Sequence, residues 1–273
     1  MVVARQRLET EVVGLALAHD SAALHVQGRA IYIDDMREPE GLVHVVPGFA
    51  REGARGLIRT VDLDAVRRYP DVLAVLTVGD IPGTNDCSPS IGGDPILADG
   101  RIMFHGQVVF AVVAETRDAA RRAARLGKVE IEVEKPAVTV DDAVSMATTD
   151  VLEPYEFKRR DAQAIIATSP CRVEESFLVG GQEHFYLEGQ VSLAIPEEHG
   201  GMTVHCSTQH PSEVQHLIAK MLGVADALVV CECRRMGGGF GGKESQAAQW
   251  AALAALAARV TGRPAKCRLD RDE

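Results

Sequence analysis

The stretch ESQAAQWAALAALAARVTG, residues 244–262, sets the strongest limit on the possible folds of this protein. It predicts a helix that is apolar on most of its faces and that ends at Gly262, with Pro264 just beyond. A helix of this kind is normally buried, because none of its faces is suited to water. The sequence therefore predicts a fold that encloses this helix in a sizeable core.

Residues 19–134 alternate short β-rich runs with brief helices. Helices are expected at 62–69, where Pro70 ends the run, and at 117–127, where a glycine ends it. Strands are expected at LVHVV (42–46), VLAVLTV (72–78), QVVFAVVA (107–114) and KVEIEVE (128–134). This part of the chain is predicted to be a compact α/β unit.

A second pattern follows a proline-containing segment at 135–170. The helix expected at 210–223 is amphipathic, with Pro211 in its first turn and Gly223 as its cap. Strands are expected at RVEESFLVGG (172–181), EHFYLEGQVSLAI (183–195), MTVHCSTQ (202–209), DALVVCECRR (226–235) and AKCRLDRDE (265–273). These strands favour an antiparallel or mixed sheet.

The two patterns predict an α+β (mixed α/β) fold class. They divide the chain into an extension at 1–18, a unit at 19–134, a connecting segment at 135–170 and the beginning of a truncated second unit at 171–273. The last expected strand breaks off at Glu273 without a polar tail, and we expect the native chain to continue beyond it.

Composition and charge exclude several classes of function. With a formal net charge of −10 and no basic stripe, the chain is a poor candidate for binding nucleic acid or an anionic membrane surface. No stretch of the sequence approaches the ~18 apolar residues of a membrane span. Six cysteines without disulfide spacing are typical of the reducing cytoplasm. Cys231 and Cys233 share one face of an expected strand; they could be half of a metal site, but we favour small side chains that face a core.

The segment RRMGGGFGGKES, residues 234–245, places five glycines within six positions. Gly237 to Lys243 fits the G-x-x-x-x-G-K core of a phosphate-binding P-loop, between an expected strand and an expected helix. A P-loop has serine or threonine after its lysine, whereas this chain has Glu244. A carboxylate about 4 Å from a phosphate would be repelled by ~4 kcal/mol at an effective dielectric constant near 20. A nucleotide-binding module is therefore the disfavoured alternative.

Five glycines suit a loop whose backbone lies close to a ligand, because glycine has no Cβ and leaves its N–H accessible. Phe240 is the one side chain within the run and offers a flat apolar surface. Glu244 stands at the start of the following helix, where its carboxylate can accept hydrogen bonds or receive a proton. The combination favours a large polar cofactor together with a small heteroaromatic substrate that carries N–H groups.

The segment GGQEHFYLE, residues 180–188, is unusually polar for an expected strand. Such polar groups are costly to bury without partners. A metal site at Glu183 and His184 is disfavoured, because adjacent residues of a strand point to opposite faces. The better interpretation is that one face supports the structure while the other presents Gln182 to a ligand.

Four segments, GGQEHFYLE, STQHPSEVQHLIAKMLG, RRMGGGFGGKES and TGRPAKCRLDRDE, together resemble the molybdenum-binding subunit of xanthine dehydrogenases, in the molybdenum hydroxylase family. The resemblance is dense over 176–273. It extends to HDSAALHVQGRAIYIDDM and AVLTVGDIPGTND, which look like the family's α/β hammerhead domain. It implies that this chain is the N-terminal portion of that subunit, a hammerhead domain followed by the first part of a molybdopterin-binding domain.

The resemblance implies a molybdenum–molybdopterin cofactor that hydroxylates an electron-poor carbon with oxygen from water. Gln182 matches the glutamine that hydrogen-bonds an oxo ligand of molybdenum. Phe240 and Gly241 match loop residues beside the metal, Gly241 through its backbone. Glu244 matches the catalytic, substrate-binding glutamate that orients the purine, where a carboxylate can polarise a purine N–H as charge builds on the ring.

Family members that oxidise aldehydes tend to carry an apolar residue in place of Glu244. The resemblance therefore implies oxidation of hypoxanthine and xanthine to urate, with aldehyde oxidation as the first alternative. The arginine that faces the purine and the general-base glutamate are expected beyond Glu273, so residues 1–273 alone are expected to be inactive.

Iron–sulfur clusters and FAD are expected on a partner chain or in sequence outside this chain, within a cytoplasmic hetero-oligomer. A non-catalytic assembly domain is a further interpretation, because residues 19–134 show no chemistry of their own.

Overall fold

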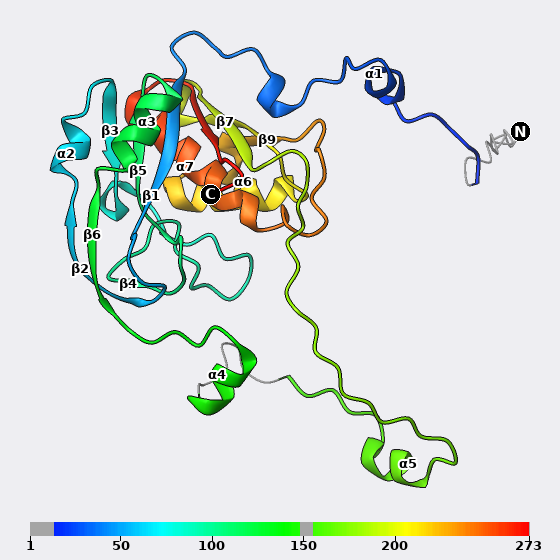
Figure 1. The fold of residues 1–273 in the computed structure, drawn as a ribbon. Helices are drawn as coiled ribbons and strands as arrows, with labels where there is room; N and C mark the ends of the chain where they lie inside the picture. The colour runs from blue at the N-terminus through cyan, green and yellow to red at the C-terminus, as the bar shows by residue number, and fades with distance from the viewer. Residues whose placement is uncertain (1–13, 148–154, 273) are drawn as a thin grey trace, which may run out of the picture.

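The computed structural model describes residues 14–147 and 155–272 as a mixed α/β fold (Figure 1). The strands are β1 (Val43–Phe49), β2 (Gly56–Asp62), β3 (Val72–Leu76), β4 (Arg101–Ile102), β5 (Val108–Ala114), β6 (Lys128–Val133), β7 (Val191–Pro196), β8 (Met202–Cys206), β9 (Val229–Glu232) and β10 (Ala265–Arg268). The helices are α1 (Ala22–Val26), α2 (Asp64–Arg67), α3 (Arg117–Ala124), α4 (Val140–Ser145), α5 (Ala162–Thr168), α6 (Pro211–Leu222) and α7 (Gln246–Thr261). Short 3-10 turns lie at Ile33–Asp35, Val78–Asp80, Glu198–Gly200 and Asp226–Leu228.

A seven-stranded mixed sheet runs in the order β3-β5-β1-β10-β7-β8-β9, and a three-stranded sheet in the order β4-β2-β6. Strands from both ends of the chain meet in the large sheet, where β1 pairs in parallel with β10 through Val43 and Ala265. On its other edge β10 pairs antiparallel with β7. The stretches 19–134 and 171–273 therefore share one sheet, and their division into two units stays an interpretation of the sequence.

Two helices explain why β5 is buried along its whole length. Side chains alternate between the faces of a strand, so neighbouring residues enter different cores. Val113 belongs to the core that contains α7, and Val112 to the core that contains α3. Coverage of both faces accounts for the continuous apolar run QVVFAVVA, of which β5 forms most.

The predicted apolar helix is confirmed as α7, the centre of the larger core. Ten of its residues, all alanine or leucine, are buried: Ala247, Ala248, Ala251, Ala252, Leu253, Ala254, Ala255, Leu256, Ala257 and Ala258. The helix packs against β7, β10 and α6. It ends at Gly262, whose φ of 65° is the left-handed conformation that glycine adopts readily.

The predicted amphipathic helix is confirmed as α6, with Pro211 in its first turn and Gly223 at its C-terminus. The expected strands at 42–46, 72–78, 107–114 and 128–134 are confirmed as β1, β3, β5 and β6. The expected helices at 62–69 and 117–127 are confirmed as the shorter α2 and α3. The sequence analysis missed β2 and β4, which pair with each other at the edge of the smaller sheet.

The strand predicted at 172–181 is wrong, and the one predicted at 183–195 exists only from Val191 onward, as β7. Residues 171–185 are exposed throughout; the side chain of Leu178 is 96% exposed. An alternating pattern produces a strand only where a neighbouring strand accepts its hydrogen bonds. Among the described residues no strand pairs with 172–181.

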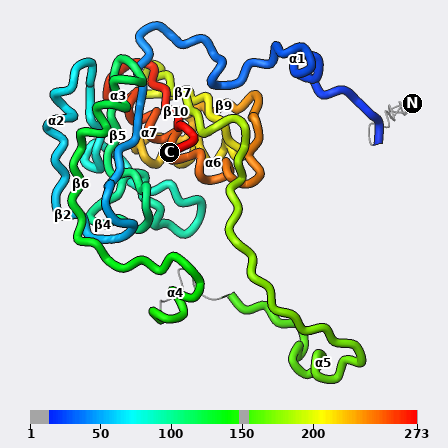
Figure 2. The backbone as a smooth tube through the Cα atoms, in the orientation of Figure 1, coloured from blue at the N-terminus to red at the C-terminus, as the bar shows by residue number. Residues whose placement is uncertain are grey.

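Residues from about 135 to 147 lead away from the body of the molecule and carry α4, and residues from 155 to about 182 carry α5 and lead back to it (Figures 1 and 2). Neither helix has a buried residue. The expected connecting segment at 135–170 lies here, and its residues 148–154 fall outside the described part of the chain. Within the described ranges, the structure contains no helix long and apolar enough to cross a membrane.

Candidate functional site

The glycine loop, residues 236–243, connects β9 to the start of α7. Its glycines are required by close packing. A Cβ on Gly237 would lie 2.5 Å from Cβ of Glu188, and one on Gly239 would lie 2.6 Å from Oε1 of Gln209. A Cβ on Gly242 would lie 2.6 Å from Cε1 of Tyr186. Real Cβ atoms do not approach other atoms so closely, so the loop packs in this way only because these positions are glycine.

Within the run from Gly237 to Gly242, three of the six N–H groups are already used by the protein. Gly237 N donates to Oε2 of Glu188 at 2.8 Å, and Gly241 N donates to Oε1 of Gln209 at 2.8 Å. Gly242 N donates to the carbonyl of Gly239 at 2.7 Å. Three consecutive N–H groups form no hydrogen bond with the described residues, those of Gly238, Gly239 and Phe240. These three N–H groups of the run are therefore not committed to the protein.

Phe240 stands at the tip of the loop with its side chain 74% exposed. Its φ of 52° is in the left-handed region, which costs a residue other than glycine roughly 1–3 kcal/mol. The surrounding hydrogen bonds hold this conformation, and a flat aromatic surface is presented beside the unpaired N–H groups. The place of Phe240 beside a metal stays a prediction.

Gln209 fastens the second half of the loop. Its Oε1 accepts hydrogen bonds from Gly241 N and from Lys243 N at 3.3 Å. Its own backbone N–H donates to the carbonyl of Lys243 at 2.9 Å. The N–H of Gly241, the residue expected beside the metal through its backbone, is therefore directed at Gln209 in this structure. The sequence analysis assigned no role to Gln209, which lies shortly before α6.

Lys243 is fully buried, with 0% of its side chain exposed. Its Nζ lies 3.2 Å from Oε2 of Glu188 and donates to Oγ of Ser207 at 2.7 Å. Burial lowers the pKa of the Lys243 ammonium, and the charge of Glu188 opposes that shift. A P-loop lysine contacts phosphates through this ammonium. Here the ammonium is committed to the protein interior, which argues against the nucleotide-binding alternative.

Residues 184–190 lie against the glycine loop. The carbonyl of Gly242 accepts a hydrogen bond from Nε2 of Gln190 at 3.0 Å and from the Tyr186 hydroxyl at 3.5 Å. The imidazole of His184 lies 3.7 Å from the position that a Cβ of Gly241 would occupy. The structure therefore brings together the two segments that the sequence analysis singled out, through residues that it did not assign.

The remaining candidate side chains are exposed. Gln182 lies two residues before His184 and forms no hydrogen bond with the described residues. Glu244 immediately follows the loop, before α7 begins at Gln246, and forms no ion pair or hydrogen bond with them either. Both polar groups are thus available to a ligand. Nothing in the described fold fixes their side chains, and the roles expected for them stay predictions.

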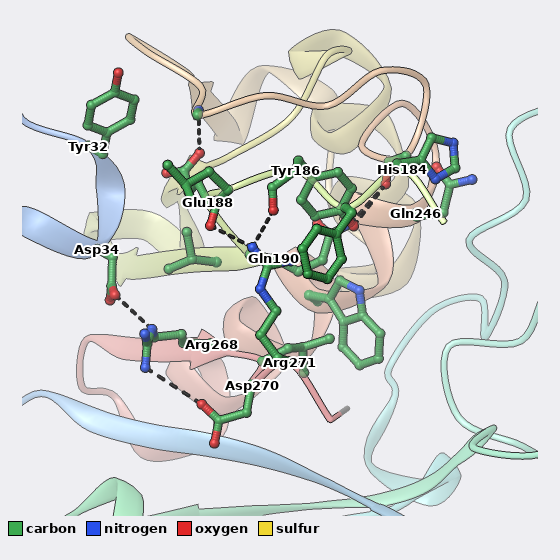
Figure 3. A pocket seen from close by; sticks show the side chains of 18 of the residues that line it. Tyr32, Asp34, His184, Tyr186, Glu188, Gln190, Gln246, Arg268, Asp270 and Arg271 are labelled. Atoms are coloured by element: carbon green, nitrogen blue, oxygen red, sulfur yellow. Dashed lines mark hydrogen bonds and ion pairs between the residues drawn. The ribbon is translucent and has the colours of Figure 1, made fainter. Parts of the chain in front are cut away.

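A cavity of about 890 Å³ opens beside the two segments (Figure 3). Its lining includes Glu188 and Gln190, together with Arg268, Asp270 and Arg271 from the end of the chain. The charged groups are paired with one another and with the backbone: Arg268 Nε lies 2.7 Å from Asp34, and Arg271 donates to the carbonyl of Leu187 at 2.7 Å. Phe240, Gln182 and Glu244 lie outside this lining. The cavity adjoins the candidate site without containing its ligand-facing groups.

The two arginines before the loop contact the N-terminal segment. Arg234 lies 3.0 Å from the carboxylate of Asp20, and Arg235 donates to the carbonyl of Ile31 and to the Ser21 hydroxyl. Among the described residues, no group of three or more His, Cys, Asp or Glu side chains could hold a metal ion. Cys231 packs against the larger core, where burial raises the pKa of its thiol. That packing agrees with the core-facing interpretation of this cysteine.

Two families match the chain in sequence. Residues 27–135 match the a/b hammerhead domain of aldehyde oxidase and xanthine dehydrogenase. Residues 145–273 match the molybdopterin cofactor-binding domain. The glycine loop and residues 182–190 both lie in the second match.

Similar proteins include xanthine dehydrogenase from Dictyostelium discoideum, 36% identical over 94% of this chain and 19% of that protein. Xanthine dehydrogenase/oxidase from Rattus norvegicus is 34% identical over 99% of this chain and 20% of that protein. The chain thus spans about a fifth of the length of the curated relatives it matches.

Among solved structures, aldehyde oxidoreductase from Desulfovibrio gigas aligns with a TM-score of 0.79 and 26% identity, over 92% of this chain and 29% of that one. Quinoline 2-oxidoreductase from Pseudomonas putida 86 aligns with a TM-score of 0.77 and 26% identity, over 94% of this chain and 34% of that one. The expected order, a hammerhead domain followed by a molybdopterin-binding domain, is confirmed.

Proposed function

This chain belongs to the aldehyde oxidase and xanthine dehydrogenase family, and from that premise we propose that it builds one wall of the molybdenum site of a purine hydroxylase. The observation that carries the proposal is the glycine loop. It offers three consecutive unpaired N–H groups next to an exposed Phe240, and Glu244 follows directly. The reaction is the oxidation of hypoxanthine and xanthine to urate.

The loop fits a polar, anionic cofactor such as molybdopterin. Consecutive N–H groups without internal partners are typical of an anion-binding concavity. When bound, the cofactor's molybdenum supplies the two-electron oxidation that places an oxygen from water on an electron-poor carbon of the substrate.

The protein's own groups bind the cofactor and orient the substrate. The exposed ring of Phe240 offers a flat face against which a planar heterocycle can align. The amide of Gln182 can donate a hydrogen bond to an oxo ligand of the metal, and the N–H of Gly238 or Gly239 can hold the cofactor. The carboxylate of Glu244 can accept a hydrogen bond from a purine N–H and so orient the ring.

Purines are favoured over aldehydes by Glu244, because an aldehyde carries no N–H group for a carboxylate to hold. The aldehyde alternative is supported by the likeness to an aldehyde oxidoreductase. The two alternatives therefore differ in what they require of one side chain.

The electrons removed from the substrate require an acceptor, and we assign iron–sulfur clusters and FAD to a partner chain or to sequence outside residues 1–273. A hetero-oligomer is proposed on the same ground. All six cysteines of the chain are free thiols, which supports a reducing cytoplasmic location.

The test compares xanthine and aldehyde oxidation in the natural protein, purified with any partner chain, before and after Glu244→Ala. Removal of one protein group that hydrogen-bonds the reacting substrate typically costs about 10²–10³-fold in turnover. We expect xanthine oxidation to fall by this order while aldehyde oxidation and bound molybdenum are retained.

The matched control is Glu232→Ala. This change removes an exposed carboxylate from β9, the strand that leads into the loop. It should leave both activities unchanged. A protein that binds molybdenum and ignores xanthine from the outset would favour the aldehyde alternative. Absence of molybdenum from the unaltered protein would refute the proposed cofactor.

A further inference from the structure

The glycine loop closes around a carboxylate of the protein itself. Oε2 of Glu188 lies 2.8 Å from N of Gly237, the first glycine, and 3.2 Å from Nζ of Lys243, which ends the loop. A single oxygen atom therefore joins the two ends of the loop. A P-loop offers glycine N–H groups and a lysine ammonium to a bound phosphate. In this chain Glu188 receives the same two kinds of donor.

The contact is buried and reinforced. Exposed fractions are 0% for the Lys243 side chain and 10% for that of Glu188. Ser207 bridges the pair, accepting from Lys243 and donating to Oε2 of Glu188 at 2.5 Å. The ammonium also lies 4.7 Å from the centre of the Tyr186 ring. The free-energy cost of removing two charges from water is offset only when the ion pair has good geometry and further hydrogen bonds. The pair therefore favours one arrangement of the two segments that carry it.

The pair also fixes residues 186–190 against the loop. The backbone N–H of Glu188 donates to the carbonyl of Gly237 at 3.2 Å, so this residue contacts Gly237 through both its backbone and its side chain. The other carboxylate oxygen, Oε1, is buried and has no hydrogen-bond partner among the described residues. The buried cluster therefore holds one carboxylate oxygen that no described residue satisfies.

We propose that Glu188 and Lys243 are positioning residues of the molybdenum site. Their buried ion pair holds the glycine loop against residues 184–190, and so sets the spacing between Phe240 and the segment that carries Gln182. Phe240 lies three residues before Lys243, and Gln182 lies six residues before Glu188. The inference rests on the proposed function for its ligand, but the clamping of the loop can be measured without it.

The experiment uses the natural protein, purified with any partner chain, in four forms: unaltered, Glu188→Gln, Lys243→Met and the double variant. Glu188→Gln keeps the shape and one oxygen but removes the charge. The double variant leaves no uncompensated buried ion, so its fold is retained even if Lys243→Met alone fails to fold. Bound molybdenum, turnover, melting temperature and the rate of tryptic cleavage after Arg235, at the entrance to the loop, are measured in each.

Loss of partners that orient a metal site typically costs about 10–100-fold in metal affinity or activity. We expect Glu188→Gln to lower turnover by this order, to reduce bound molybdenum and to accelerate cleavage after Arg235. The double variant should recover the melting temperature without recovering turnover or resistance to trypsin. A purely structural pair would behave differently, because all four quantities would recover together, and that result would overturn the proposal.

The matched control is Lys220→Met on α6, which breaks a lysine–carboxylate pair with Asp86 of similar length, 3.0 Å, away from the loop. It should change neither molybdenum content nor cleavage after Arg235. Failure of the proposed function appears as an unaltered protein without molybdenum. Failure of the positioning role appears instead as unchanged cleavage and molybdenum content in Glu188→Gln and the double variant.

Discussion

The glycine loop at 236–243 and the segment at 172–181 both lack regular structure, yet they differ in every other respect. Each end of the loop is bonded to a buried carboxylate, and its carbonyls and N–H groups contact Gln190 and Gln209. The segment at 172–181 is exposed along its whole length. Absence of helix or strand therefore does not mean absence of order; order follows from whether polar groups have partners.

The same contrast holds for apolar residues, and it gives the largest expected effect. Leu253 of α7 is fully buried, whereas Leu178 is 96% exposed. Leu253→Ala leaves a cavity in the central core and should reduce the free energy of unfolding by about 2–5 kcal/mol. Leu178→Ala should change it by less than about 0.5 kcal/mol. Urea unfolding followed by circular dichroism measures both, and equal effects would break the comparison.

Substitution of glycines in the two regions should change the free energy of unfolding by a smaller amount than Leu253→Ala. A Cβ at Gly242 would lie 2.6 Å from the Tyr186 ring and 2.9 Å from the His184 ring. At Gly181 a Cβ would meet no atom within 4 Å. Gly242→Ala should therefore destabilise the fold by about 1–3 kcal/mol through overpacking. Gly181→Ala is its matched control in the same unfolding experiment, and loss of stability there would show that the segment is packed after all.

A third kind of irregular segment, residues 269–272, is anchored by charge. Burial alone would raise the pKa of Asp270, but the hydrogen bond and charge of Arg117, with Arg121 beside it, lower the pKa below its ordinary value of 3.8. The ionised carboxylate therefore stabilises the folded state above about pH 4, and this stabilisation is lost as pH falls through the lowered pKa.

Asp270→Asn should accordingly reduce the free energy of unfolding by about 1.5 kcal/mol at pH 7. The difference from the unaltered protein should shrink as the pH falls below about 4 and through the lowered pKa, because Asp270 of the unaltered protein is then protonated. Urea titrations across this range measure the effect. A difference that is independent of pH would show that the amide disturbs packing rather than charge.

Much of the fold could be predicted from local signals. Pro211 and Gly223 mark the ends of α6, and the apolar faces of α7 require the core that encloses it. β2 was missed because most of its side chains are exposed, so its sequence carries no clear alternation of apolar and polar residues. What makes it a strand is its pairing with β6, which lies about seventy residues later in the chain.

The site shows the same limit. Phe240 and Glu244 could be proposed as ligand-facing residues from the sequence of the loop and the residue after it, and both side chains are exposed in the structure. The partner of Lys243 could not be predicted, because the lysine of the same G-x-x-x-x-G-K pattern can contact either a bound phosphate or a carboxylate of the protein. The deciding residue, Glu188, is separated from it by 55 positions. The polar character of GGQEHFYLE indicated that some buried partner was needed, but it did not identify the partner.

The parallel pairing of β1 with β10 sets an order of events during synthesis. β1 contacts β5 and β3 lies beyond β5, so three strands of the large sheet can assemble early on the ribosome. The other edge of β1 must wait for Ala265, the partner of Val43. At about 5–20 residues per second the ribosome takes roughly 10–45 s to make the intervening chain. Throughout that interval the unpaired edge of β1 is open to pairing with other chains. A chaperone that covers this edge would prevent such pairing in the nascent protein.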